Sequence, residues 1–148
     1  MGRLNDITQR HNAFVQNMNI HIAASIELVS PQLVNMNKAQ MLDSKDSKGK
    51  SLIHKDTGSK NLSLYYSIKT NKQTPNLFLE GTFQNEMFLD VNENNLTYFV
   101  DSLDFKSGIL TDNYGLDIFG IPRKRNAEAK RLTGKAFATR YKRLVLQK

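Results

Sequence analysis

The sequence predicts an α+β fold, in which an antiparallel sheet of three to four strands is flanked by an N-terminal amphipathic helix and a basic C-terminal helix. Three observations predict it. Apolar residues recur every three to four positions at both ends of the chain, they alternate with polar residues between the ends, and Lys and Arg gather near the C-terminus. A chain of 148 residues without internal repeats fits a single domain, residues 1–148.

Residues 1–42 are expected to form a helical arm. Apolar side chains from Leu4 to Val29 follow helical spacing, which predicts one amphipathic helix over residues 4–29. Pro31 suits the first turn of a second helix, over residues 31–41, because proline there gives up no helical hydrogen bond.

Residues 43–61 are expected to form a flexible loop. The run over residues 43–50 is polar and has no period, and a second polar turn follows at residues 55–60. Loops of this length in a compact domain are usually functional or ordered by a partner.

Residues 62–121 are expected to hold the sheet and a short helix. Alternation predicts a strand over residues 62–69, and an antiparallel hairpin of residues 83–91 and 96–102 around an Asn-rich turn. This register places four side chains on the buried face of the hairpin: Met87, Leu89, Tyr98 and Val100.

The chain after the hairpin is expected to return to helix. Ser102 or Asp104 can cap a short helix that ends at Gly115, where a glycine commonly follows the last turn. A short apolar run, residues 116–121, precedes the last helix, which Asn126 can cap.

The basic helix, residues 122–148, carries most of the charge asymmetry. The segment from Arg123 to Lys148 contains ten Lys or Arg residues and one acid, a charge of +9, whereas the whole chain carries +7. Such asymmetry favours an anionic partner, although a solvated helix face is the alternative interpretation. The candidate residues for binding a partner or DNA phosphates are Arg123, Lys124, Arg125, Lys130, Arg131, Lys135, Arg140, Lys142 and Arg143.

The sequence contains no residue pattern typical of catalysis. It has no Cys, which excludes thiolate metal sites and cysteine nucleophiles. His11 and His21 lie ten residues apart on one predicted helix, about 15 Å along its axis, so they cannot share a metal. No serine stands in a Gly-x-Ser-x-Gly turn, and no phosphate-binding loop is present. We therefore expect a protein that is not an enzyme and needs no cofactor or metal.

The order of parts over residues 56–145 resembles the small neck proteins of tailed bacteriophages, the head–tail joining or tail-completion family. Members of that family often carry a Thr-Gly turn that leads into the sheet. Residues 56–63 of this chain are similar to that turn, and residues 80–85 are the alternative match. Residues 114–123, Tyr-Gly-Leu-Asp-Ile-Phe-Gly-Ile-Pro-Arg, resemble the aromatic–small pair, glycine and Pro-Arg element that precede the last helix of that family. The run Arg-Lys-Arg at residues 123–125 departs from the family, which more often has a single arginine and an aromatic residue there.

The resemblance implies a non-enzymatic virion structural protein of the neck, a head–tail connector or a component of a tail-completion ring. Its implied partners are other copies of itself in a ring, neighbouring virion proteins (portal, adaptor or tail) and the DNA backbone without sequence preference, but no membrane. Its implied location is the virion, after assembly in the cytoplasm of a host bacterium. The alternative is a small basic nucleic-acid-binding protein, although base-stacking residues are absent beside the basic groups.

Overall fold

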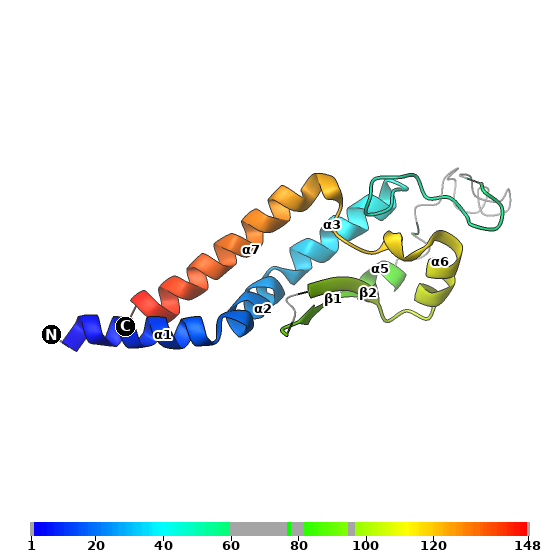
Figure 1. Cartoon of the computed structure of the whole chain (residues 1–148). Coiled ribbons are helices and arrows are strands. Elements are labelled where there is room, and N and C mark those ends of the chain that lie inside the picture. Colours follow the sequence, from blue (N-terminus) through cyan, green and yellow to red (C-terminus); the bar gives the residue numbers. More distant parts are fainter. Residues whose placement is uncertain (1, 60–76, 78–81, 95–96, 148) are drawn as a thin grey trace.

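The computed structural model describes residues 2–59, 77, 82–94 and 97–147, and these form an elongated, mostly helical molecule (Figure 1). Three helices follow one another along its length, and the last helix returns beside them, so that both termini lie at the same end (Figure 1). These four helices are α1 (Gly2–Gln16), α2 (Met18–Leu28), α3 (Ser30–Leu42) and α7 (Asn126–Tyr141).

The sheet is smaller than the sequence predicts. Among the described residues it consists of β1 (Met87–Asn92) and β2 (Thr97–Ser102), which pair antiparallel. The expectation of three to four strands was therefore wrong, although helices combined with an antiparallel sheet still make an α+β protein. The strand predicted for residues 62–69 lies outside the described residues.

Two segments with apolar or alternating patterns form helical turns instead of strands. The start of the predicted strand 83–91 belongs to the short helix α5 (Thr82–Asn85), and the apolar run after Gly115 begins with the 3-10 turn η1 (Leu116–Ile118). The carbonyl oxygen of Ile118 accepts hydrogen bonds from side-chain amides of α3 and is not part of a strand ladder. Tertiary contacts therefore override the local pattern in this run.

The antiparallel hairpin itself is confirmed, and the described side chains that were predicted to be buried share one face of it. Leu89 stands opposite Val100 in the ladder. Met87 and Val100 are buried and Leu89 is half-buried, while the side chain of Tyr98 lies outside the described set. The hairpin packs this face against α2 and α3.

The N-terminal arm differs from the single helix predicted for residues 4–29, because it is interrupted at Asn17. The side-chain amide of Asn17 donates to the carbonyl oxygen of Ala13 at 2.9 Å, and its backbone leaves the helical region at φ −109° and ψ 29°. Asparagine favours such local bonds over continued helix. Pro31 lies in the first turn of α3, as predicted.

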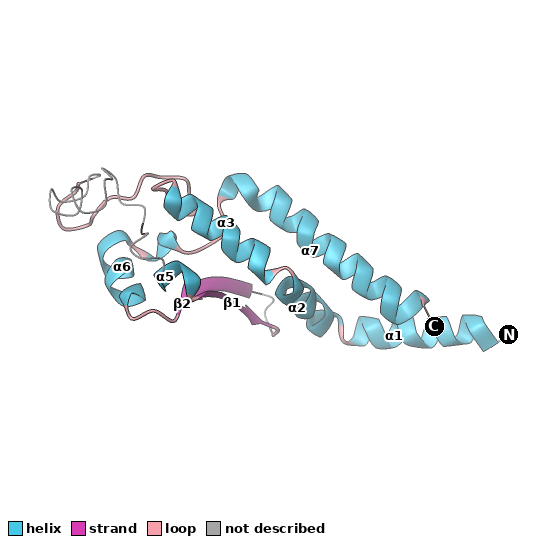
Figure 2. Cartoon of the chain, turned by 180° about the vertical axis from the view of Figure 1, so that it is seen from behind, coloured by secondary structure: helices cyan, strands magenta, loops and turns pink. Residues whose placement is uncertain are grey.

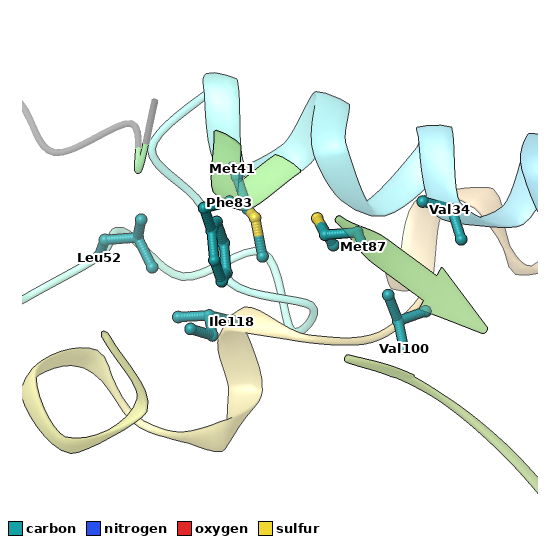
Figure 3. Packing of buried hydrophobic residues seen from close by; sticks show 7 residues of the cluster. All are labelled: Val34, Met41, Leu52, Phe83, Met87, Val100 and Ile118. Carbon is teal, nitrogen blue, oxygen red and sulfur yellow. The ribbon is translucent and has the colours of Figure 1, made fainter. Parts of the chain in front are cut away.

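The core lies on both sides of α3, in two clusters. One lies between α3, the hairpin and residues around Ile118, and Figure 3 shows the side chains of Met41, Phe83 and Ile118 converging there. Its buried members are Val34, Met41, Leu52, Phe83, Met87, Val100 and Ile118. The other joins α2 and α3 to α7, and its buried members are Ile26, Val29, Leu33, Met36, Ala129 and Ala136.

Residues 43–59 of the predicted loop contact the rest of the chain. Leu52 is 2% exposed and belongs to the core. The backbone N–H of Ser47 donates to the carbonyl oxygen of Asp117 at 2.8 Å, and the N–H of Lys55 donates to that of Asn113 at 2.8 Å. These bonds fasten the segment at two points, and its flexibility stays a prediction.

The short helix α6 (Lys106–Tyr114) begins and ends at the predicted residues. A side-chain oxygen of Asp104 accepts a hydrogen bond from the N–H of Lys106 at 2.8 Å. Gly115 follows the helix with a φ of +93°, a backbone conformation that residues other than glycine rarely adopt.

Candidate partner-binding surface

The helix α7 is held by small and apolar residues on one side. Ala129 and Ala136, seven residues apart, are 4% and 7% exposed and pack in the cluster with α2. After Tyr141 the chain continues in a π-helical turn, η3 (Lys142–Leu146), in which Val145 is completely buried near α1. One side of α7 is thus fixed against the arm, and the other faces solvent.

Three basic residues share the solvent side of α7. Lys135 follows Arg131 by four residues and Lys142 follows Lys135 by seven, so the three side chains lie on one helix face over about 16 Å. All three are exposed, although Lys142 is the first residue of η3, and none of the three side chains makes a hydrogen bond or an ion pair with another residue in the described part of the chain. We call these three residues the basic face; Lys130 and Arg143, also exposed, lie beside it.

Arg140 is different, because its side chain turns toward the arm. Its Nε donates to Nδ1 of His21 at 3.2 Å. The ring of His21 stacks on Phe14, with ring centroids 4.0 Å apart. Burial lowers the pKa of His21, and the positive charge of Arg140 lowers it further. Arg140 therefore links α7 to α2 through this hydrogen bond, and its role in binding a partner stays a prediction.

The remaining candidates, Arg123, Lys124 and Arg125, form the 3-10 turn η2 before α7. Nζ of Lys124 lies 3.9 Å from Oδ2 of Asp43, and both side chains are largely exposed, so this pair contributes little to stability. The turn borders a hollow of about 280 Å³ together with Lys45 and Lys48 of the preceding loop. Of the nine predicted basic residues, three thus form the basic face, two lie beside it, one bonds to the arm and three form this turn at the start of α7.

An acidic segment of the chain complements the basic one in charge and was not predicted from the sequence. Residues 82–121 contain one Lys, Lys106, and seven acids, a net charge of −6. The acids are Glu86, Asp90, Glu93, Asp101, Asp104, Asp112 and Asp117. Counting charges along the sequence shows that this segment is acidic. Which acids share one face of the hairpin can be known only from the observed strand pairing.

The larger hollow offers no arrangement typical of catalysis. It measures about 480 Å³ and lies between β2, α6 and the residues around Phe119. Asp101 is its one ionisable lining residue, and Oδ1 of Asp101 accepts a hydrogen bond from the hydroxyl of Ser107 at 3.1 Å. Over the ranges that the structure describes, no three His, Asp or Glu side chains are grouped as a metal site would require.

The chain matches no protein-family model, no curated protein and no solved structure. Within the described ranges, none of the helices is long and apolar enough to cross a membrane. The resemblance to phage neck proteins therefore stays a prediction from the sequence, and the surface charges carry the functional argument.

Proposed function

We propose that the protein is a non-enzymatic structural protein of a tailed-phage virion, and that it forms part of a ring at the head–tail connection or the end of the tail. The observation that carries this proposal is the basic face of α7, whose charges have no partner among the described residues. Like charges at helical spacing disfavour one another by a few tenths of a kcal/mol per pair, and an anionic partner offsets this.

The shape of the molecule supports the same function. The chain is elongated, and it presents the long side of α7 on one side and the hairpin on another (Figures 1 and 2). A subunit of a ring needs two different surfaces for its two neighbours. The order of parts, from helical arm through hairpin to basic helix, supports the resemblance to neck proteins.

The test is the composition and form of the phage particle. Mass spectrometry of purified particles should detect the protein, and electron microscopy of lysates from a phage that lacks its gene should show separate heads and tails. Complete, infectious particles formed without the protein would contradict the proposal.

A nucleic-acid-binding protein is the second candidate, and the basic face is the observation that favours it. Non-specific DNA binders typically show dissociation constants of roughly 10⁻⁴ to 10⁻⁶ M at physiological salt, with a slope of about −0.9 per phosphate contact in log–log plots against salt. Phe88 and Phe99, aromatic residues exposed on the hairpin, lie beside Asp90 and Asp101, whose charges repel phosphate. This arrangement disfavours base stacking there, and fluorescence anisotropy with unrelated duplexes measures the binding directly.

A further inference from the structure

We propose that the basic face of α7 binds the exposed face of the β1–β2 hairpin of a second copy of this chain. The inference rests on the proposed function, a subunit of a ring, and it names the anionic partner of the basic face. That partner is the same protein, so neither DNA nor an unrelated protein is needed to neutralise α7.

The exposed face of the hairpin combines two aromatic rings with the exposed carboxylate of Asp90 and the half-buried carboxylate of Asp101, whose Oδ1 already accepts hydrogen bonds from the N–H of Ser102 and the hydroxyl of Ser107. The register pairs Phe88 with Asp101 and Asp90 with Phe99, on the side opposite to Met87 and Val100. Phe88 is 37% and Phe99 53% exposed. Asp90 is exposed and makes no ion pair with any described residue. We call these four residues, Phe88, Asp90, Phe99 and Asp101, the acidic face.

The two faces cannot meet within one chain. Both views show α7 on one side of α2 and α3 and the hairpin on the other (Figures 1 and 2). The hairpin turns its buried face toward these helices, and α7 packs its alanine side against them. The charged faces therefore point away from each other, and only two copies can bring them together.

The chemistry of the two faces is complementary. Arg and Lys side chains bind carboxylates through charge-assisted hydrogen bonds, and they are attracted to the faces of aromatic rings. Residues two apart on a strand, such as Phe88 and Asp90, are separated by about 7 Å, and residues four apart on a helix, such as Arg131 and Lys135, by about 6 Å. Successive side chains of the helix can thus pair with successive side chains of the strand.

The resulting contact joins two different surfaces, so each copy can bind one neighbour through α7 and another through the hairpin. Such a heterologous contact forms a ring when the rotation between copies closes, and a filament when it does not. The wider charge distribution favours the same pairing, since residues 123–148 carry +9 and residues 82–121 carry −6.

The first test is cross-linking between copies. The chain has no Cys, so each introduced cysteine is unique. We expect a mixture of the full-length variants Asn92→Cys and Thr139→Cys, exposed positions beside the two faces that leave their charges in place, to form a covalent dimer with a short bis-maleimide linker, at least several-fold more than either variant alone. A mixture that gives no more dimer than the separate variants would overturn the proposal.

The second test reverses the charges of each face in turn. Arg131→Glu with Lys135→Glu reverses the basic face, and Glu86→Lys with Asp90→Lys reverses the charge of Asp90 in the acidic face together with that of Glu86, the exposed acid immediately before β1. Sedimentation velocity at low salt should show oligomers for the unmodified chain and monomers for each double variant. An equimolar mixture of the two double variants should form a dimer, because each supplies one unmodified face.

The matched control is Arg3→Glu with Lys50→Glu, which removes the same charge from exposed positions outside α7. It should assemble like the unmodified chain. A monomeric unmodified chain, or a basic-face variant that still forms oligomers, would overturn the inference. The proposed function is tested separately by the presence of the protein in purified particles, so either one can fail while the other stands.

Discussion

At the scale of single residues, Asn37 determines how the chain enters the basic helix. Its side chain is completely buried, its Nδ2 donates to the carbonyl oxygen of Ile118 at 2.8 Å, and its Oδ1 accepts from the N–H of Gly120 at 3.2 Å. Gln40 donates a second bond to the oxygen of Ile118 at 3.1 Å. The side-chain amide of Asn37 thus forms hydrogen bonds with the backbone of residues 118–120 that a neighbouring strand would otherwise form.

We expect Asn37→Ala to lower the free energy of unfolding by about 1–3 kcal/mol, because the part-buried N–H of Gly120 loses its acceptor and the carbonyl oxygen of Ile118 loses one of its two donors. Chemical denaturation followed by circular dichroism measures the change. Asn35→Ala is the matched control, since Asn35 lies on the same helix and is exposed. Equal losses in the two variants would show that the hydrogen bonds of Asn37 do not stabilise the fold.

His21 makes the packing of α7 on the arm sensitive to pH. Its pKa is lowered by burial and by Arg140, so the unfolded chain binds the proton more readily than the folded chain. Stability should therefore fall as the pH falls below the ordinary histidine value of about 6.5, and should be kept above it. A protonated Nδ1 also cannot accept the hydrogen bond from Arg140.

Melting temperatures measured between about pH 8 and about pH 5 test this expectation. His21→Gln keeps an acceptor for Arg140 but does not titrate, so its melting temperature should fall less across this range than that of the unmodified chain. Identical pH profiles for the two proteins would show that His21 does not link protonation to folding.

At the scale of elements, the hairpin was predictable and the segments around it were not. Alternation along residues 87–91 and 97–102 is a local signal that gives the face on which each side chain lies, whereas the register comes from the observed pairing, such as that of Leu89 with Val100. The helical turn of α5 and the course of residues 116–121 depend on partners far away in the sequence, since the hydroxyl of Ser102 bonds to the carbonyl oxygen of Phe83 and α3 bonds to Ile118. No local period contains that information.

The candidate site was predictable as a charge count but not as a surface. Composition identified the basic segment, and helical spacing placed Arg131 and Lys135 on one side of α7. The inward turn of Arg140 depends on His21, more than one hundred residues earlier. The acidic face required the pairing of Asp90 with Phe99, which combines a strand register with the exposure of both side chains.

A new charge at two neighbouring positions of β1 should lower the free energy of unfolding by very different amounts. Met87→Asp should lower the free energy of unfolding by several kcal/mol, because Met87 is 7% exposed in the core and an unpaired buried carboxylate is costly. Phe88→Asp, one residue later on the exposed face, should change it by far less. Urea denaturation of both variants measures the contrast, and equal losses would contradict the observed register.

At the scale of the whole molecule, we expect the distribution of charge to influence self-association more than the net charge of +7 does. α7 and the hairpin lie on opposite sides of α2 and α3 (Figure 1), so the basic residues of α7 and the acids of the hairpin segment make the molecule electrically polar. Such a molecule should attract its own copies at low ionic strength even though a uniformly positive one would repel them.

We therefore expect self-association to weaken as NaCl is raised from about 50 mM to about 500 mM, because salt screens charges that are partly exposed. Light scattering after size exclusion at each salt concentration measures the mass of the assembly. An assembly that grows or stays constant over this range would indicate that apolar contacts, and not the charged faces, hold the copies together.

The most demanding prediction concerns particle assembly. Lys130, Arg131 and Lys135 are all exposed on α7 and none belongs to the buried cluster that fixes the helix, so replacing all three by Glu should leave the fold intact. Circular dichroism and the melting temperature check that condition. The same variant should stop heads from joining tails, because the reversed charges repel the acidic surface that α7 is proposed to bind. Electron microscopy of lysates and the infectious titre measure the outcome. A normal titre from the triple variant would show that this side of α7 is only a solvated helix face.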